Sequence, residues 1–370
     1  MPAVALPATA DWLAALAGEP LPGRRQEDWR FTDLAPLQAV APQLWAGPDP
    51  FAHVVLPAGV TRLDGAEIQA LADPILHATG SATAWPVRLN QGASPHGLAL
   101  RVSGAAGPLQ LQLDAGDGPG LLALQLLLVL EEGASFELLV RHASRGANAT
   151  SLVTLVQLGR GARLNLGVLA AGDARASLLS HLAISQAPAS ELQLTTAVGG
   201  WGLSRLEPRV CQLEGAAQTR LRALQLVDGQ ELADTHSQVS FGGPEGELDQ
   251  LHKVVADGAG RSVFNGAVRV PRQAQQTNAA QLSRSLLLSE RARVDTKPEL
   301  EIVADDVKCA HGATVSRLQQ NELFYLQSRG IAADQASKLL LRGYCEEVLR
   351  ELPAAAAACH PLQLLLPERP

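Results

Sequence analysis

Hydrophobic and polar residues alternate with a period of two through the middle of the chain, from about residue 85 to residue 315. Segments such as Leu98–Val102, Leu109–Leu113 and Leu164–Val168 place every second side chain on one face. This is the pattern of short β-strands with one buried side. The middle of the chain is therefore predicted to be mainly β.

The same region carries a repeat. Several of the predicted strands follow a turn of small residues, and the alanines of these turns are spaced by 28, 27 and 27 residues: Ala134, Ala162, Ala189 and Ala216. Short strands and tight turns at a constant period predict a right-handed parallel β-helix, in which each coil buries its face on the next. We expect short edge strands at both of its ends. The pattern weakens after residue 216, and a β-sandwich, which gives similar alternation, is the alternative fold.

Both ends of the chain have a helical composition instead. Helix-like segments are Thr9–Gly18, Gly65–Ala72, Glu322–Ser328 and Ala332–Leu352, and the many prolines near the start keep the first helices short. The tail after Pro353 is low in complexity and is expected to be loosely held. The predicted domains are an N-terminal helical domain (1–84), a β-helix core (85–318) and a C-terminal helical domain (319–370).

Charge and composition narrow the function. A formal net charge of -7 and a pI near 5.7 argue against nucleic acid or an anionic membrane as the main partner. The longest apolar run, Leu121–Leu130, is too short to span a bilayer, and the start of the chain lacks the basic and apolar regions of a secretory signal. We therefore expect a cytoplasmic protein. The chain has no phosphate-binding loop, so it should not hydrolyse ATP by itself, and it has no nucleophile elbow.

The four cysteines include no Cys-x-x-Cys pair, but Cys309 and His311 are separated by one residue. In an extended chain such residues project from the same face roughly 7 Å apart, close enough to converge on a metal or a sulfur species. Lys308 is expected to favour the thiolate form of Cys309 modestly. Two ligands are too few for a closed site, so a metal here would need ligands from another chain.

Three other features have ordinary interpretations. Asp305 and Asp306 could serve glycoside hydrolysis, but neighbours on a strand point to opposite faces, which favours a turn. The pair His252-Lys253 is predicted to lie on the surface. Trp29 and Phe31 are predicted to anchor the N-terminal domain by burying aromatic area.

Two motifs resemble a known family. The run Thr296–Val315 resembles the C-terminal signature of the SufB/SufD family of iron–sulfur cluster assembly scaffold proteins, and Arg25–Thr32 resembles the N-terminal signature of its SufD branch. Shorter similarities lie at His252-Lys253, Val263–Gly266 and Leu286–Ser289.

The resemblance implies a β-helix between helical regions in a SufD-like scaffold subunit that is non-catalytic and has no catalytic residues. It implies pairing with a SufB-like paralogue, binding of a SufC-like ABC-type ATPase through the C-terminal helices, and a part in iron entry. His311 falls on the family histidine that faces SufB across the heterodimer interface, with Cys309 beside it. A transient iron or iron–sulfur cluster would lie at that interface, and none would be bound stably by this chain alone. In isolation the chain could form a homodimer.

Exposed apolar residues of the C-terminal helices are expected to form or support the surface that binds the ATPase. These residues are Leu323, Phe324, Tyr325, Leu340, Tyr344 and Val348. The alternative is that this stripe only covers the end of the β-helix, which would otherwise expose open strand edges.

Two other functions stay open. A SufB-like paralogue would build the cluster itself and predicts a longer chain with more cysteines in the core. A β-helix polysaccharide hydrolase or lyase predicts a cluster of carboxylates or of Arg and Lys on one face of the solenoid.

Overall fold

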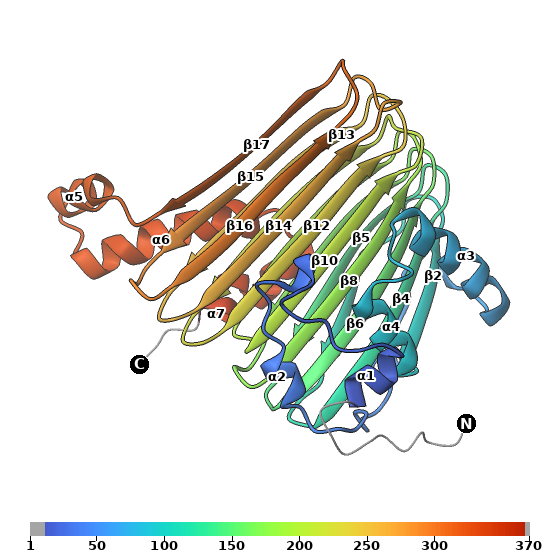
Figure 1. Cartoon of the computed structure of the whole chain (residues 1–370), viewed down its shortest axis with the longest axis horizontal. Coiled ribbons are helices and arrows are strands. Elements are labelled where there is room, and N and C mark those ends of the chain that lie inside the picture. The colour runs from blue at the N-terminus through green and yellow to red at the C-terminus, as the bar shows by residue number, and fades with distance from the viewer. Residues whose placement is uncertain (1–11, 367–370) are drawn as a thin grey trace.

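In a computed structural model, which describes residues 12–366, the chain forms a solenoid of two long parallel β-sheets with helices near both ends (Figure 1). In spatial order, sheet 1 contains β1 (Val60–Arg62), β2 (His96–Val102), β4 (Gly120–Leu130), β6 (Asn148–Leu158), β8 (Ser177–Gln186), β10 (Leu203–Gln212), β12 (Leu232–Phe241), β14 (Arg261–Val270) and β16 (Arg293–Ile302). Sheet 2 contains β3 (Leu109–Asp114), β5 (Ser135–Ala143), β7 (Arg163–Ala171), β9 (Glu191–Gly199), β11 (Gln218–Val227), β13 (Glu247–Ala256), β15 (Asn278–Leu287) and β17 (Lys308–Ser316).

From β2 onward the chain changes sheet at every strand. Each strand then pairs in parallel with the strand two places along the chain, and the antiparallel contact of β1 with β2 is the exception among the named pairs. The predicted parallel β-helix is confirmed. The β-sandwich is excluded, because it requires antiparallel sheets.

One residue in each coil has a left-handed backbone, in the turn that precedes a strand of sheet 2. These residues, with φ between 47° and 66°, are Gly133, Gly161, Ala189, Ala216, Glu245 and Gln276. Each donates its backbone N–H to a carbonyl of the next turn, and the stack ends at the carbonyl of Asp306. The repeat therefore continues past residue 216. It fades in the sequence because the last two positions are no longer small residues and the spacing grows to 29 and 31.

The two ends of the solenoid differ in their edge strands. At the first end, β1 has 3 residues and β3 has 6. At the other end, β16 has 10 residues and β17 has 9, and most of their side chains are exposed or half-buried. The expectation of short edge strands at both ends is wrong for this second end, which we call the open end.

Helices cover the outer faces of both sheets (Figure 1). Near the N-terminus they are α1 (Trp12–Ala17), η1 (Glu27–Trp29), α2 (Ala35–Gln38), α3 (Gly65–Ala78) and α4 (Trp85–Gly92). After the solenoid come α5 (Gln320–Ser328), α6 (Ala333–Leu349), η2 (Ala354–Cys359) and α7 (Pro361–Leu365). No helix within residues 12–366 is long and apolar enough to cross a membrane.

Two details of the predicted ends need correction. The first residues of the predicted Thr9–Gly18 helix lie outside the described part of the chain, and α1 covers Trp12–Ala17. The segment after Pro353 is not loosely held up to residue 366, because Ala356 and Leu365 are buried against the outer face of sheet 2.

The N-terminal segment is fixed to sheet 1 by one buried arginine. The Arg205 guanidinium lies 3.8 Å from the Trp29 ring centre and donates to the carbonyl of Asp28 and the hydroxyl of Thr32, each at 3.0 Å. It also donates to Glu207 at 2.6 Å. Burial opposes ionisation of Glu207, but the charge of Arg205 outweighs it and holds the pKa of Glu207 well below its usual range.

Trp29 is buried and Phe31 packs against the same cluster. The predicted anchoring of the N-terminal region by these two aromatic residues is confirmed.

The interior of the solenoid changes from apolar to polar along its length. One inward-facing position can be followed through the strands of sheet 2, and we call it the His311 column: Leu109, Leu138, Leu166, Leu194, Leu221, Gln250, Gln281 and His311. Leucine fills the first five positions, and polar side chains fill the last three. The polar end of the column lies at the open end.

Candidate functional site at the open end

Cys309 and His311 lie on β17, the last strand of sheet 2, which has only β15 as a neighbour. Cys309 is paired in register with Ala279, and His311 with Gln281. Both partners on β15 are buried, with 2% of their surface exposed, so this side of the strand faces the interior. Paired residues of parallel strands share a face, so Cys309 and His311 point together to the interior side of the open end. The predicted arrangement of the two residues on one face is confirmed.

The chemistry of Cys309 differs from the expectation. Burial raises the pKa of its thiol above 9.0, which favours the protonated form near neutral pH. Lys308 precedes it on the strand and therefore points to the opposite face. The prediction that Lys308 favours the thiolate is thus wrong, because the local environment of Cys309 is dominated by loss of water and not by that charge.

The described residues offer an incomplete ligand set. Within residues 12–366 no group of three or more His, Cys, Asp or Glu side chains is placed to hold a metal ion. Cys309 and His311 supply one sulfur and one imidazole, both suited to iron, at an edge where further ligands can approach. The arrangement fits a site that is completed from outside the chain.

In the coils that precede Cys309 and His311, the interior contains polar side chains that were not predicted from the sequence. Gln281 and Gln250 are buried in the His311 column, and the side chain of Gln281 donates to that of Gln250 at 2.9 Å. His252 is fully buried, with its ring stacked on Phe264 at 4.3 Å between ring centres. Burial lowers the pKa of His252 to about 3, so the ring is neutral. A search for inward positions at the coil spacing would have found these residues.

Lys253 points to the other side of the same strand, beneath α6. Its ammonium donates to the carbonyl of Tyr344 at 2.7 Å, pairs with Glu347 at 2.6 Å and lies 3.7 Å from the centre of the Tyr344 ring. The prediction that His252-Lys253 is a surface feature is wrong. Both residues are buried because α6 covers the outer face of β13 while sheet 1, including Phe264 of β14, covers its inner face.

The six predicted partner-binding residues fall into two groups, one on α5 and one on α6, which differ in exposure. On α5, Phe324 and Tyr325 are 73% and 58% exposed, and Leu323 beside them is half-buried. On α6, Val348 is buried and Tyr344 donates its hydroxyl to the carbonyl of Arg284 at 2.7 Å. Leu340 is half-buried. The α6 residues therefore hold the helix near or against sheet 2, whereas the α5 aromatic residues are free to contact another molecule.

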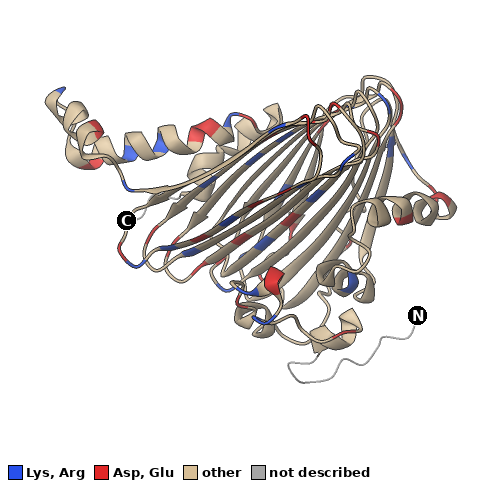
Figure 2. Cartoon of the chain, turned by 45° about the horizontal axis from the view of Figure 1, so that its top comes forward, with Lys and Arg blue, Asp and Glu red and all other residues tan. Residues whose placement is uncertain are grey.

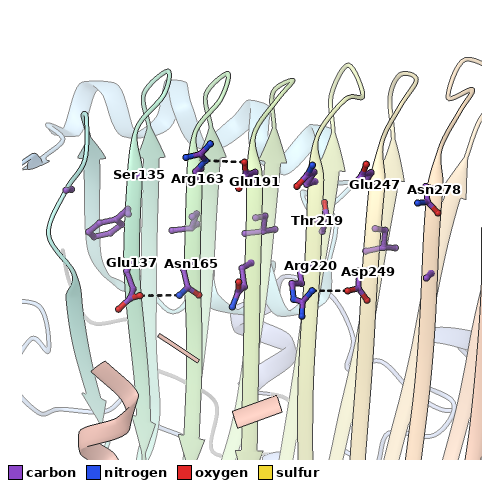
Figure 3. Close-up of a pocket in the computed structure, with 18 residues that line it drawn as sticks. Ser135, Glu137, Arg163, Asn165, Glu191, Thr219, Arg220, Glu247, Asp249 and Asn278 are labelled. Atoms are coloured by element: carbon purple, nitrogen blue, oxygen red, sulfur yellow. Dashed lines mark hydrogen bonds and ion pairs between the residues drawn. The ribbon is translucent and has the colours of Figure 1, made fainter. Parts of the chain in front are cut away.

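A groove of about 700 Å³ crosses the outer face of sheet 2 (Figure 3). It has the carboxylates and arginines that a polysaccharide-cleaving enzyme would predict, but both of its arginines are paired with carboxylates. Arg163 donates to Glu191 at 3.1 Å, and Arg220 donates to Asp249 at 3.1 Å (Figure 3). Glu137 accepts from Asn165 at 3.2 Å. These pairs connect neighbouring strands and make the groove a charged ladder, with no aromatic side chain besides Phe136 in its lining.

Asp305 and Asp306 lie in the bend between β16 and β17, where the carbonyl of Asp306 accepts from Gln276. The turn interpretation of this pair is confirmed. Charged residues of both signs are interspersed along the strands and along α6 (Figure 2).

Comparison with known proteins gives a consistent result. The family model described as "SUF system FeS cluster assembly, SufBD core domain" matches residues 113–344, which is more than half of the chain. An iron–sulfur cluster assembly SufBD family protein of Synechocystis is 36% identical over 248 residues, covering 64% of this chain and 55% of that protein.

Two relatives are named iron–sulfur cluster assembly protein SufD. The protein of Escherichia coli is 39% identical over 142 residues, covering 38% of this chain and 34% of that protein. The protein of Bacillus subtilis is 44% identical over 102 residues, covering 28% of this chain and 23% of that protein. The match thus spans about half the length of the Synechocystis relative and less of these two.

Proposed function

The chain belongs to the SufBD family of iron–sulfur cluster assembly proteins, and we propose that it acts there as a SufD-like, non-catalytic scaffold subunit. It pairs with a SufB-like chain, binds a SufC-like ATPase and helps to bring iron to a cluster under construction. The observation that carries this proposal is the open end, where β16 and β17 are long strands without cover from residues 12–366 and β17 presents Cys309 and His311.

The edges of β16 and β17 support pairing with another solenoid. An uncovered edge strand exposes a row of unpaired backbone donors and acceptors, and a second chain satisfies them by adding its own strand. A SufB-like chain is the partner in the complex, and a second copy of this chain can occupy the same edge in isolation. Pairing of this kind brings ligands from the partner to Cys309 and His311.

The ligand pair itself supports transient binding of iron or of an iron–sulfur cluster. A neutral imidazole is a reversible iron ligand, and a thiol that stays protonated near neutral pH joins only when a metal displaces its proton. His311 is therefore the main ligand of this chain, and Cys309 is secondary. Because the remaining ligands belong to the partner, movement of the two chains opens the site and releases the cluster.

Docking of the ATPase is assigned to α5. Phe324 and Tyr325 are large exposed apolar side chains on a helix that projects beyond the solenoid (Figure 1). Such a helix fits an apolar groove of a partner. The packing of α6 on sheet 2 then connects that contact to the solenoid, so that movement of the ATPase reaches the open end.

The N-terminal motif and the relatives named SufD favour a SufD-like role over a SufB-like one. A SufB-like chain that builds the cluster itself is the second candidate. The two are separated by whether this chain, expressed without its partners, assembles a cluster from iron and sulfide.

The experiment that tests the proposal is affinity purification of the tagged full chain with its SufB-like and SufC-like proteins. His311→Ala should keep both partners but lose most of the cluster formed per complex. Replacing Phe324 and Tyr325 together by Ser should lose the ATPase and keep the SufB-like chain, whereas Gln327→Ser on the same helix is the matched control. An intact His311→Ala complex with full cluster content rejects the ligand role, and failure to retain either protein rejects the assembly.

A further inference from the structure

The polar side chains behind His311 form a directed chain of hydrogen bonds. The amide of Gln281 donates from Nε2 to Oε1 of Gln250 at 2.9 Å, and Gln250 donates from Nε2 to the hydroxyl of Ser237 at 2.8 Å. Exposed fractions are 2% for Gln281, 4% for Gln250 and 4% for Ser237. Every bond in this chain therefore runs in one direction, away from the open end.

The chain begins with an unused acceptor. Oε1 of Gln281 is buried and has no hydrogen-bond partner within the described residues. A buried carbonyl oxygen without a donor is costly, and native structures supply a partner for nearly all such groups. The question is which donor lies next to it.

Register makes His311 the candidate donor on the next strand, although its ring forms no hydrogen bond with Gln281 in this structure. Gln281 and His311 are paired on adjacent strands, about 4.8 Å apart. The Nε2 end of the Gln281 amide is directed to the preceding strand, so its oxygen is turned toward the following one. Gly266 on sheet 1 allows this placement, since a Cβ atom there would lie 2.5 Å from Nε2 of Gln281. In a ladder of stacked amides, each carbonyl accepts from the next strand, and here the next strand carries an imidazole instead of an amide.

We propose that Gln281 is a positioning residue for His311: when the imidazole turns toward the interior, Oε1 of Gln281 accepts its ring N–H and fixes which nitrogen keeps the free lone pair. The value of this contact for iron binding rests on the proposed function, but the contact itself does not. A neutral imidazole has one N–H and one free nitrogen, and the hydrogen bond made by the first decides the orientation of the second. Metal-binding histidines ordinarily have such a partner on their other nitrogen.

An amide partner also suits a site that must release its cargo. A carboxylate in this position would add negative charge and make the imidazole a stronger base and a tighter ligand. The neutral carbonyl of Gln281 orients the ring without adding charge. Such a contact gives the ligand a defined direction without strengthening its basicity.

The test uses the full chain with ¹⁵N-labelled histidine and long-range ¹H–¹⁵N NMR, with the His311 signals assigned by their loss in His311→Ala. In the parent chain one neutral tautomer of His311 should dominate. Gln281→Leu should give a mixture of both tautomers, and Gln281→Glu, which keeps an acceptor oxygen, should restore one tautomer.

Gln225→Leu is the matched control, because Gln225 is an equally buried amide whose partners are Thr235 and Ser262 and not the His311 column. It should leave His311 unchanged. Binding of Co²⁺, measured by the same signals, should weaken about tenfold in Gln281→Leu and remain near the parent value in the control.

Tautomer populations in Gln281→Leu that equal those of the parent and of the control would overturn the proposal, and so would a mixture of tautomers in Gln281→Glu. Failure of the proposed function would look different. In that case His311→Ala complexes would make clusters normally while the tautomer of His311 still depended on Gln281.

Discussion

The first and last coils of the solenoid share one backbone geometry but are filled differently. In the His311 column the first coils present leucine at every level, and Leu138 and Leu166 are fully buried. The last coils present Gln250, Gln281 and finally the exposed His311. Apolar filling stabilises a coil by removing hydrocarbon from water, whereas polar filling only balances the desolvation of its own groups. The first coils are thus built for stability, and the last coils give up stability to place chemistry at an edge.

The first end of the solenoid is also better covered by other elements than the open end. The first end has short strands, and the N-terminal helices pack on the outer face of its sheet 1 strands. The open end has full-length strands with exposed residues and an outward-projecting α5. In a solenoid each coil contacts only its neighbours, so a coil without a neighbour is the least stable part. A second chain that packs on the open end therefore adds more stability there than it would at the covered first end.

The largest effect is expected from a core leucine of the first coils. Leu166→Ala should lower the free energy of unfolding by about 2–5 kcal/mol, because it leaves a cavity in a closely packed interior. Leu300→Ala on β16 is the matched substitution at the open end, where the side chain is half-buried. It should cost less than half as much. Urea unfolding followed by circular dichroism measures both, and equal losses would contradict the difference between the ends.

Hydrogen exchange should show the same gradient without any substitution. Backbone amides of β16 and β17 should exchange on the order of 100-fold faster than those of β7 and β9, since edge strands open without disturbing the core. Mass spectrometry of deuterated peptides measures this in the isolated chain. Addition of the SufB-like partner should slow exchange at β16 and β17 and leave β7 and β9 unchanged. Uniform protection along the solenoid would refute the distinction.

The smallest effect concerns the thiol of Cys309. Because burial raises its pKa above the ordinary value for a thiol, its reaction with iodoacetamide should keep rising with pH from pH 7 to pH 9 without reaching a plateau. Lys308→Ala should change the rate by less than about twofold, since that side chain points to the opposite face. The measurement uses a chain in which Cys211, Cys345 and Cys359 are replaced by Ser. A plateau below pH 8, or a large effect of Lys308→Ala, would show that the thiolate is stabilised after all.

Much of the architecture was predictable because it follows from local periodicities in the sequence. Alternation identified the strands, and the small residues around Gly133 and Gly161 identified the coil length. The small-residue signal failed at Glu245 and Gln276, where residues with long side chains occupy the left-handed turn position. Such turns are tolerated when the stacked carbonyls of neighbouring turns hold them, and this support is invisible in a single segment.

Alternation also failed to separate inside from outside where both sides of a strand are buried. His252 faces the interior and Lys253 faces α6, yet both look polar and therefore exposed in the sequence. A strand covered on both faces carries no polar face for the pattern to reveal. The distinction depends on which helix returns to cover sheet 2, and that helix lies about 90 residues further along the chain.

The sequence by itself determined the solenoid, its coil length, the helical ends and the placement of Cys309 and His311 on one side of a strand. These are properties of residues close together in the chain, where sterics and alternation decide the outcome. Only the tertiary structure decided that β17 is an edge strand, that burial raises the pKa of Cys309 and that Gln281 is paired in register with His311. Those facts depend on the stacking of coils about 30 residues apart and on what covers the last one, and no local pattern encodes either.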